Sequence, residues 1–361
     1  MKLPDIPTRI VLAPMAGGVG TPELVAAVGN AGGLGFLPSG YVPVDLVRHD
    51  LDAVRQLSSA PCGINVFVPS GPSQARLQLA VDYAARLRPW ADRHGLPIGR
   101  PTYSDDDYEA KIELLLETRP AIVSFTFGAP APDIVQALHQ VGVAVLATVT
   151  SPVEAAEAEE TGADGLVVQG WEAGAHRGGW QNEHDELGLL PLLQLVSMQT
   201  DLPMVAAGGI ATGAGIAAVL AAGAQAAMLG TAFMRCPEAG TAPIHEAALS
   251  GHTRTVVTKA FTGRRARALD NGFVRELGPT APDAYPEVHY MTSPLRSEAK
   301  RRNDAESLHL WAGQAHALAT SLPAGELIGE LVTDTRAATG RMLASAPGDP
   351  SDRHLESEGS P

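Results

Sequence analysis

The sequence is poor in the residues that mark secreted and nucleic-acid-binding proteins. Only two cysteines, Cys62 and Cys236, occur in 361 residues, which is too few for a disulfide framework or a zinc site. Both stand beside proline at the edges of apolar segments, so we expect two buried free thiols. Basic residues are outnumbered by acidic ones, 26 to 40, and the net charge of −14 argues against a nucleic-acid partner. We expect no metal site.

Long apolar runs are also missing. The longest, 216–228, contains Gln225 and falls short of the roughly 20 residues that cross a bilayer. The N-terminus has no charged segment followed by an apolar one, as a signal peptide would. We therefore expect a cytoplasmic protein that does not engage a membrane.

Short apolar runs, rich in β-branched residues, alternate with helical stretches. They are 10–13, 34–37, 63–68, 121–125, 143–149, 165–168, 203–207 and 226–229. Runs that are apolar on consecutive residues suit parallel strands covered on both faces, and their alternation with helices indicates βαβ units. Helix starts are marked at Thr21-Pro22 and Ser151-Pro152. Eight such units predict a (β/α)₈ TIM barrel, an α/β fold.

A typical barrel leaves about 100 of the residues over. We assign 1–236 to the barrel and 237–303 to a helical cap domain inserted after strand eight, with no regular strand expected in 238–290. Residues 304–345 are expected to form helices that pack back on the barrel, and 346–361, rich in Ser, Gly, Pro, Asp and Glu, a disordered tail. The long unit 69–119 has no role evident from sequence.

Two glycine turns carry the strongest local signal. Gly208-Gly209 ends the seventh predicted strand and Gly230-Thr231 ends the eighth. Barrels commonly bind phosphate in these two loops, where backbone N–H groups face the anion and glycine permits close approach. The alternative is that tight turns require glycine anyway. The turns predict a phosphate-binding site but do not identify the ligand that carries the phosphate.

A second signal is the loop after strand six, which combines glycines with Gln, Glu, His and Arg side chains. It contains Gln169, Gly174, His176 and Arg177. His176 is the candidate acid/base, because imidazole exchanges protons near neutral pH and catalysis sits at the carboxyl ends of barrel strands. The alternative is a solvated loop histidine.

Other polar residues are weaker candidates. Asn65 is an amide within an apolar strand and must be hydrogen-bonded if buried; it is either a satisfied core residue or, with Gln169, part of a polar ligand site. His289, in the cap, is a candidate for lining a substrate cavity. The basic cluster 263–267 is either a solvated face or an anion-attracting rim.

At these residues the sequence resembles the nitronate monooxygenase family, formerly called 2-nitropropane dioxygenases, and is most similar to its bacterial class I members. The likeness rests on segments 13–18, 63–67, 169–178, 207–210, 229–231 and 310–314. The histidine loop is the most specific of them. One departure is Ala175, where the family usually has glycine.

The resemblance implies an FMN-dependent oxidoreductase without a metal. It assigns flavin contacts to Met15, Asn65, Gln169, Gly174, Gly208, Gly209, Gly230 and Thr231, and the catalytic base to His176. His289 and Arg177 are tentative substrate-binding residues. The partners are a small nitronate or nitroalkane and O₂, and the protein is expected to be a monomer or homodimer.

The implied reaction oxidises an alkyl nitronate, by default the toxic metabolite propionate 3-nitronate, to a carbonyl compound and nitrite, through a flavosemiquinone that returns its electron to O₂. One alternative is an FMN reductase that uses NAD(P)H, similar to NADH:quinone reductases or enoyl-acyl-carrier-protein reductases. Another is a non-catalytic phosphate- or nucleotide-binding barrel.

Overall fold

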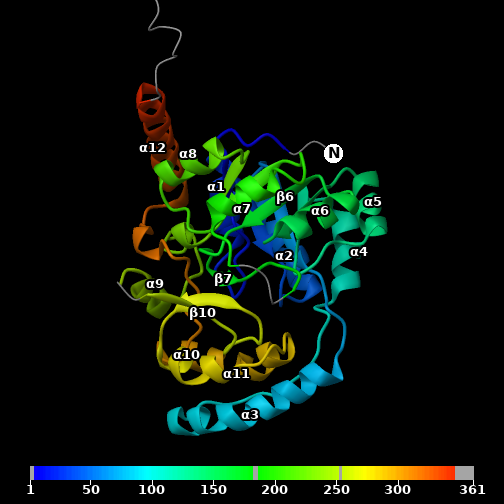
Figure 1. Ribbon diagram of the computed structural model, residues 1–361, viewed down its shortest axis with the longest axis vertical. Helices are drawn as coiled ribbons and strands as arrows, with labels where there is room; N and C mark the ends of the chain where they lie inside the picture. The colour runs from blue at the N-terminus through cyan, green and yellow to red at the C-terminus, as the bar shows by residue number, and fades with distance from the viewer. Residues whose placement is uncertain (1–3, 182–185, 252–253, 346–361) are drawn as a thin grey trace, which may run out of the picture.

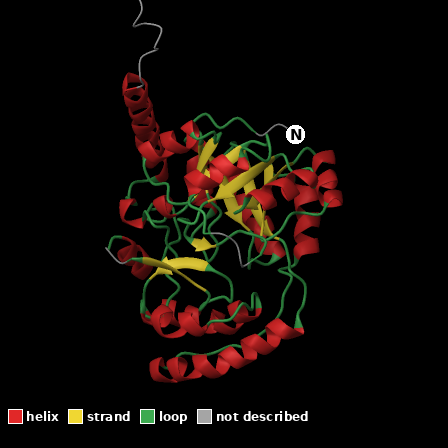
Figure 2. Cartoon of the chain, viewed as in Figure 1, coloured by secondary structure: helices red, strands yellow, loops and turns green. Residues whose placement is uncertain are grey.

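The chain is built on a closed barrel of eight parallel strands, seen in a computed structural model that describes residues 4–181, 186–251 and 254–345 (Figure 2). The strands succeed one another around the barrel in chain order, and the last pairs with the first. They are β1 (Ile10–Leu12), β2 (Leu34–Pro38), β3 (Cys62–Phe67), β4 (Ile122–Thr126), β5 (Ala144–Val149), β6 (Gly165–Gln169), β8 (Met204–Ala207) and β9 (Ala226–Leu229). The predicted TIM barrel is confirmed, and each predicted strand overlaps an observed one.

The barrel strands are apolar on consecutive residues because both of their faces are buried. Val11 and Phe36 belong to a cluster made of barrel-strand residues, whereas their neighbours Ile10 and Leu37 pack in a larger cluster that includes helix residues. Side chains alternate between the two faces of a strand, so one set fills the barrel and the other holds the helices.

In the part of the chain that the structure describes, eight helices form the outer layer. They are α1 (Pro22–Asn30), α2 (Val44–Leu57), α4 (Tyr108–Thr118), α5 (Pro132–Gln140), α6 (Pro152–Glu160), α7 (Leu189–Val196), α8 (Gly213–Ala221) and α12 (Ala324–Ser345). The two predicted helix starts are confirmed, since the Thr21 and Ser151 hydroxyls each accept a backbone N–H of the first turn. The C-terminal helix α12 packs against α8 and α1 and completes the ring (Figure 1).

A second body of elements lies below the barrel in Figure 1. It contains α3 (Gln74–His94), β10 (Thr255–Thr258), β11 (Ala266–Leu269), α10 (Gly272–Leu277) and α11 (Glu287–Arg302), and α9 (Pro243–Leu249) lies beside it. Three short 3₁₀ helices, η1 (Thr231–Phe233), η2 (Gly278–Thr280) and η3 (His316–Leu318), occur in the connections. We call this body the cap.

The expectation that 238–290 contains no regular strand is wrong. Strands β10 and β11 pair antiparallel, and β11 also pairs with the two-residue strand β7 (Ala175–His176). Thr255–Thr258 has β-branched residues that favour a strand, but Ala266–Leu269 has none and becomes one because it lies between two partners. The cap is therefore mixed, and its sheet reaches the predicted histidine loop.

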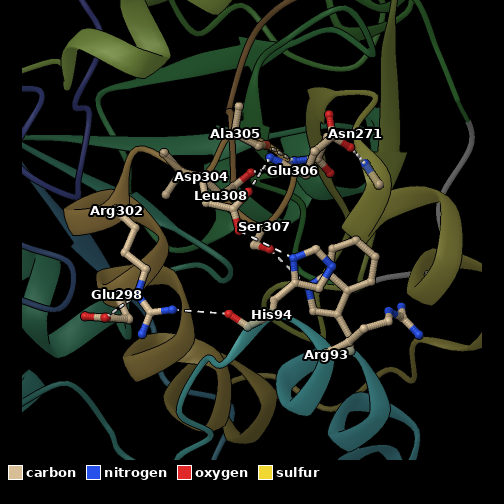
Figure 3. Close-up of polar contacts among 12 residues, drawn as sticks. Arg93, His94, Asn271, Glu298, Arg302, Asp304, Ala305, Glu306, Ser307 and Leu308 are labelled. Atoms are coloured by element: carbon tan, nitrogen blue, oxygen red, sulfur yellow. Dashed lines mark hydrogen bonds and ion pairs between the residues drawn. The ribbon is translucent and has the colours of Figure 1, made fainter.

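The long unit 69–119 supplies one cap helix and one barrel helix. Helix α3 buries Tyr83 and Trp90 against Phe261 and Phe273, and α4 returns to the barrel between α2 and α5. Figure 3 shows the polar side of this docking, where Arg302 of α11 donates a hydrogen bond to the carbonyl oxygen of His94 at 3.2 Å. The segment thus completes the cap core from a distant part of the chain.

Several expectations concern residues that the structure does not describe or does not test. The predicted tail, 346–361, lies outside the described residues. Cys62 and Cys236 are buried free thiols, as predicted. Of the helices described, none has the length and apolar character needed to cross a membrane. The domain boundaries at 236, 303 and 345 stay a prediction.

Candidate active site

A cavity of about 580 Å³ lies at the carboxyl ends of the barrel strands, within the roughly 300–1,000 Å³ typical of small-molecule sites. All eight barrel strands, or the residues that directly follow them, contribute to its wall, and the cap closes the other side through α9, α11 and the segment 308–315. This is the face of a (β/α)₈ barrel at which ligands bind and reactions occur.

The cavity brings together ten of the eleven residues predicted from sequence. They are Met15, Asn65, Gln169, Gly174, His176, Gly208, Gly209, Gly230, Thr231 and His289. Their separate roles stay a prediction.

The structure does not bring Arg177 into the cavity wall. Its guanidinium donates to the carbonyl oxygens of Gln169 and Gly170, at 3.3 and 2.5 Å, and lies over the Trp171 ring. The side chain follows His176 on an extended segment and so points to the opposite side. The charged group of Arg177 is therefore directed at backbone carbonyls of the loop, away from the cavity.

Two arginines of the basic cluster 263–267 are buried, and the third, Arg265, is partly exposed and lies 3.9 Å from Glu186. Arg264 donates to the carbonyl oxygens of Arg177 and Gly179, and Arg267 donates to that of Trp171. For Arg264 and Arg267 both expectations, a solvated face and an anion-attracting rim, are wrong, because these side chains are directed at backbone carbonyls.

The two glycine turns differ in why they need glycine. Gly208 and Gly209 have φ of +113° and +69°, a region that side chains rarely adopt. Gly230 has an ordinary φ of −109°, and the atoms nearest to a Cβ there would be Ala13 Cβ at 3.4 Å and Met15 Sδ at 3.7 Å. Glycine at 230 is thus not required by the backbone, and its absent side chain leaves room on the cavity wall.

The buried amide of Asn65 and the partly buried amide of Gln169 make different hydrogen bonds. The Asn65 side-chain nitrogen donates to the carbonyl and hydroxyl oxygens of Ser124 and to the Thr126 hydroxyl, at 2.9–3.1 Å. The amide nitrogen of Asn65 is therefore satisfied within the core, as one of the two interpretations of this residue expected. Gln169 accepts the Gly178 N–H at 2.8 Å and donates to the His176 carbonyl at 3.1 Å. Gln169 therefore stabilises the histidine loop by hydrogen bonds to His176 and Gly178.

His176 is held by the cap sheet. It lies on β7, opposite Ala266 of β11, and its ring is surrounded by Phe127, Tyr285 and Trp311 with centroids 5.7–5.8 Å away. The residue before it, Ala175, has φ of +59°, a conformation that favours glycine and accounts for the glycine usual in the resembling family. The departure strains the loop without displacing His176 from the cavity.

Thr262 contacts one ring nitrogen of His176. The Thr262 hydroxyl oxygen lies 3.0 Å from Nε2 of His176 and 3.2 Å from the Arg264 carbonyl oxygen, and when it donates its one proton to the carbonyl it accepts from Nε2–H. The other ring nitrogen, Nδ1, is then an acceptor, and no described residue donates to it. Burial, and secondarily the charges of Arg264 and Arg296, lower the pKa of His176 to about 3. The ring is a neutral base at physiological pH.

Three further histidines line the cavity: His245, His289 and His309. Burial lowers the pKa of His245 to about 4 and places the pKa values of His289 and His309 well below their usual range. Arg296 donates to Nδ1 of His289 at 3.2 Å, which fixes that ring as a neutral acceptor at this atom. The described residues contain no group of three or more His, Cys, Asp or Glu placed to hold a metal ion.

We predict that these buried neutral histidines make the protein sensitive to mild acid. In the unfolded chain these histidines become protonated as the pH falls below about 6.5. In the folded protein His176 and His245 stay neutral until the pH approaches 3–4, so the free energy of unfolding falls between these pH values. At pH 5.5 each contributes a loss of about 1.4 kcal/mol. Urea unfolding at pH 7.5 and 5.5 measures the loss, and a His245→Gln variant should show a smaller one. Equal stability at both pH values would contradict this.

Several cavity residues escaped sequence reasoning. Tyr41 follows β2 and stacks on His289 at 3.7 Å between centroids, and Phe127 directly follows β4. The positions of Tyr41 and Phe127 at the carboxyl ends of predicted strands could have identified them as cavity residues. Arg296 and His309 carried no such signal, because only the folding of the cap over the barrel brings them to the site, whereas Trp311 lies in the segment 310–314 that carries the family resemblance.

The barrel, the cavity at its carboxyl ends and a desolvated histidine with an open nitrogen define an enzyme of the (β/α)₈ class. A family model described as nitronate monooxygenase matches residues 3–334. The chain is 41% identical to a nitronate monooxygenase of Paraburkholderia phytofirmans, over 92% of this chain and 93% of that protein. It therefore belongs to the nitronate monooxygenase family and is an oxidoreductase.

Solved structures agree with this membership. A nitroalkane oxidase from Streptomyces ansochromogenes is 44% identical with a TM-score of 0.90, covering 93% of this chain and 98% of that one. FabK from Thermotoga maritima is more distant, 26% identical with a TM-score of 0.74, covering 93% of this chain and 95% of that one. The alternative of a non-catalytic barrel is set aside, because the relatives at 35–41% identity carry an enzyme's name.

Proposed function

We propose that the protein is an FMN-dependent nitronate monooxygenase that oxidises alkyl nitronates with O₂ to a carbonyl compound and nitrite. The observation that carries the proposal is the placement of His176, a neutral base with its Nδ1 open, in the same cavity as the glycine turns of β8 and β9. The names of the relatives support the same activity.

The residues of the cavity fit FMN. Gly208, Gly209, Gly230 and Thr231 form a cradle at the ends of β8 and β9 in which a Cβ at Gly230 would occupy the wall. This cradle would hold the phosphate, and Asn65 and Gln169 the polar edge of the isoalloxazine ring. When bound, FMN supplies the one-electron redox chemistry with O₂.

His176 would take the proton from the carbon that bears the nitro group of a neutral nitroalkane. Nδ1 is the acceptor, while Thr262 holds the ring through Nε2 at 3.0 Å. An imidazolium at this site is disfavoured by burial, so the nitronate anion formed beside it provides the compensating charge. A nitronate supplied as the anion needs no such step.

The aromatic side chains around His176 keep water from the reacting carbon. Phe127 and Tyr285 flank the ring, and Trp311 covers it from the segment 308–315. Exclusion of water strengthens the interaction between the histidine and the developing anion.

The test is the colour and oxygen uptake of the purified protein. We expect an absorbance spectrum of bound FMN, confirmed by its release on denaturation, and O₂ consumption with nitrite release when propionate 3-nitronate is added. A colourless protein that takes up no FMN would overturn the proposal.

A second candidate keeps the barrel and FMN but reduces the flavin with NAD(P)H. It is the reductase alternative that the sequence left open. The chain is less similar to FabK, at 26% identity, than to the Paraburkholderia phytofirmans nitronate monooxygenase, at 41%. The two differ in the electron donor, which a single anaerobic mixing experiment identifies.

A further inference from the structure

We infer that one face of helix α11, centred on Arg296, is an anion subsite that binds a carboxylate on the tail of the nitronate substrate. This inference rests on the proposed function of the same cavity. It names the residue that selects among nitronates, a role for which the sequence offered Arg177 and His289 as candidates.

Arg296 is a buried cation in the cavity wall with neutral partners. Its residue is 7% exposed, and its guanidinium donates to the Thr292 hydroxyl at 3.1 Å and to the carbonyl oxygen and Nδ1 of His289 at 2.9 and 3.2 Å. No carboxylate among the described residues lies within ion-pair distance, and none of them accepts a hydrogen bond from its Nη1. Buried charges in proteins are ordinarily paired, so an anionic ligand is the missing partner.

The cavity as a whole favours a negative ligand. Among the described residues its wall includes Arg296 and Lys300 but no Asp or Glu, in a chain whose net charge is −14. The other buried arginines nearby, Arg177, Arg264 and Arg267, are directed at backbone carbonyls and do not line it. Two positive charges without an acidic neighbour raise the local concentration and the affinity of anions.

The spacing along α11 places a row of polar side chains, which we call the track, on the cavity side of the helix. His289, Ser293, Arg296 and Lys300 follow one another at steps of four, three and four residues, so they share one face of the helix, and they line the cavity together with Ser297. Arg296 is buried, whereas Ser297 and Lys300 are exposed. The track therefore runs from the interior beside His289 to the cavity mouth.

Arg296 also acts electrostatically on the base. Its charge is one of the causes that lower the pKa of His176. Arg296 and His176 also line the same cavity of about 580 Å³, so a single small molecule bound there contacts both. A nitronate carbon at His176 and a carboxylate on a short tail at Arg296 satisfy this arrangement, and a bidentate pair of guanidinium and carboxylate is the geometry that arginine favours.

The experiment compares two pre-formed nitronates that differ in one charge. One is propionate 3-nitronate, and the other is the nitronate of its primary amide, which has the same length but a neutral tail. Pre-formed nitronates avoid the proton step, so a change in the pKa of His176 does not enter. The variants are Arg296→Gln, Arg296→Lys and, as a control on the same helix, Arg301→Gln, whose exposed side chain pairs with Glu298.

We expect wild-type kcat/KM to favour the carboxylate over the amide by more than tenfold. Arg296→Gln should lower kcat/KM for the carboxylate by about 10- to 100-fold, the worth of a hydrogen bond to a charged group, and leave the amide within about threefold. Arg296→Lys should restore part of the loss, and Arg301→Gln should change neither substrate.

Three results would overturn the inference. They are equal use of the two substrates by the wild type, an equal loss for both in Arg296→Gln, and loss of bound FMN from that variant, which would make Arg296 a phosphate contact instead. The wild-type comparison stands even if Arg296→Gln does not fold. If the wild type oxidises neither nitronate, the proposed function itself fails, which is a different outcome from oxidising both alike.

Discussion

The His176→Asn variant is expected to lose turnover of neutral nitroalkanes by about 10²- to 10⁴-fold, the usual contribution of a positioned general base, while it still oxidises pre-formed nitronates. Asparagine keeps a polar group near Thr262 but offers no atom that accepts a proton at neutral pH. Only the neutral nitroalkane has to lose a proton, so only its turnover depends on the histidine nitrogen that accepts it. Initial rates with nitroethane and with ethyl nitronate measure the two activities.

A histidine of α2 provides the control for this variant. His49 is exposed and far from the cavity wall, so His49→Asn should leave both activities unchanged. Because the pKa of His176 is lowered to about 3, wild-type kcat/KM for nitroethane should not fall as the pH is lowered through 6.5. If His176→Asn loses both activities equally, the residue holds the site together and is not the base.

The Gly230→Ala variant is expected to bind FMN about 10- to 100-fold more weakly and still fold. The φ of −109° accommodates alanine, and the atoms nearest to the added methyl, in Ala13 and Met15, lie at ordinary contact distances. The methyl would instead occupy the wall against which we place the phosphate, and each charge-assisted hydrogen bond lost is worth about 1.5–3 kcal/mol. Titration of the apoprotein with FMN, followed by fluorescence quenching, measures the affinity.

The matched control is Gly329→Ala, in the interior of α12, where an added Cβ meets nothing within 4 Å. It should leave FMN affinity unchanged and raise stability slightly, by up to about 1 kcal/mol, because alanine favours a helix over glycine. Unchanged FMN affinity in Gly230→Ala would place the phosphate elsewhere.

The sequence predicted the barrel well because its signals are local. Each strand is a short apolar run, and helix starts such as Thr21-Pro22 and Ser151-Pro152 are marked by the residues themselves. The glycine turns were equally readable, since their place at the ends of the last two barrel strands follows from strand order alone.

The cap was predicted poorly because its structure depends on distant partners. Ala266–Leu269 is a strand only between β10 and β7, and α3 joins the cap from a segment more than 150 residues earlier than Phe261. The same pairing buries Arg264 and Arg267, which no local pattern indicates. Arg296 likewise becomes a cavity residue only when the cap closes on the barrel.

The most direct test of the central claim is anaerobic mixing of the FMN-loaded protein with either an alkyl nitronate or NADH, followed by absorbance at the flavin maximum. A nitronate monooxygenase should lose flavin absorbance rapidly with the nitronate, regain it when O₂ is admitted, and show no rapid change with NADH. Rapid bleaching by NADH, with none by the nitronate, would contradict the account and identify a nicotinamide-dependent reductase.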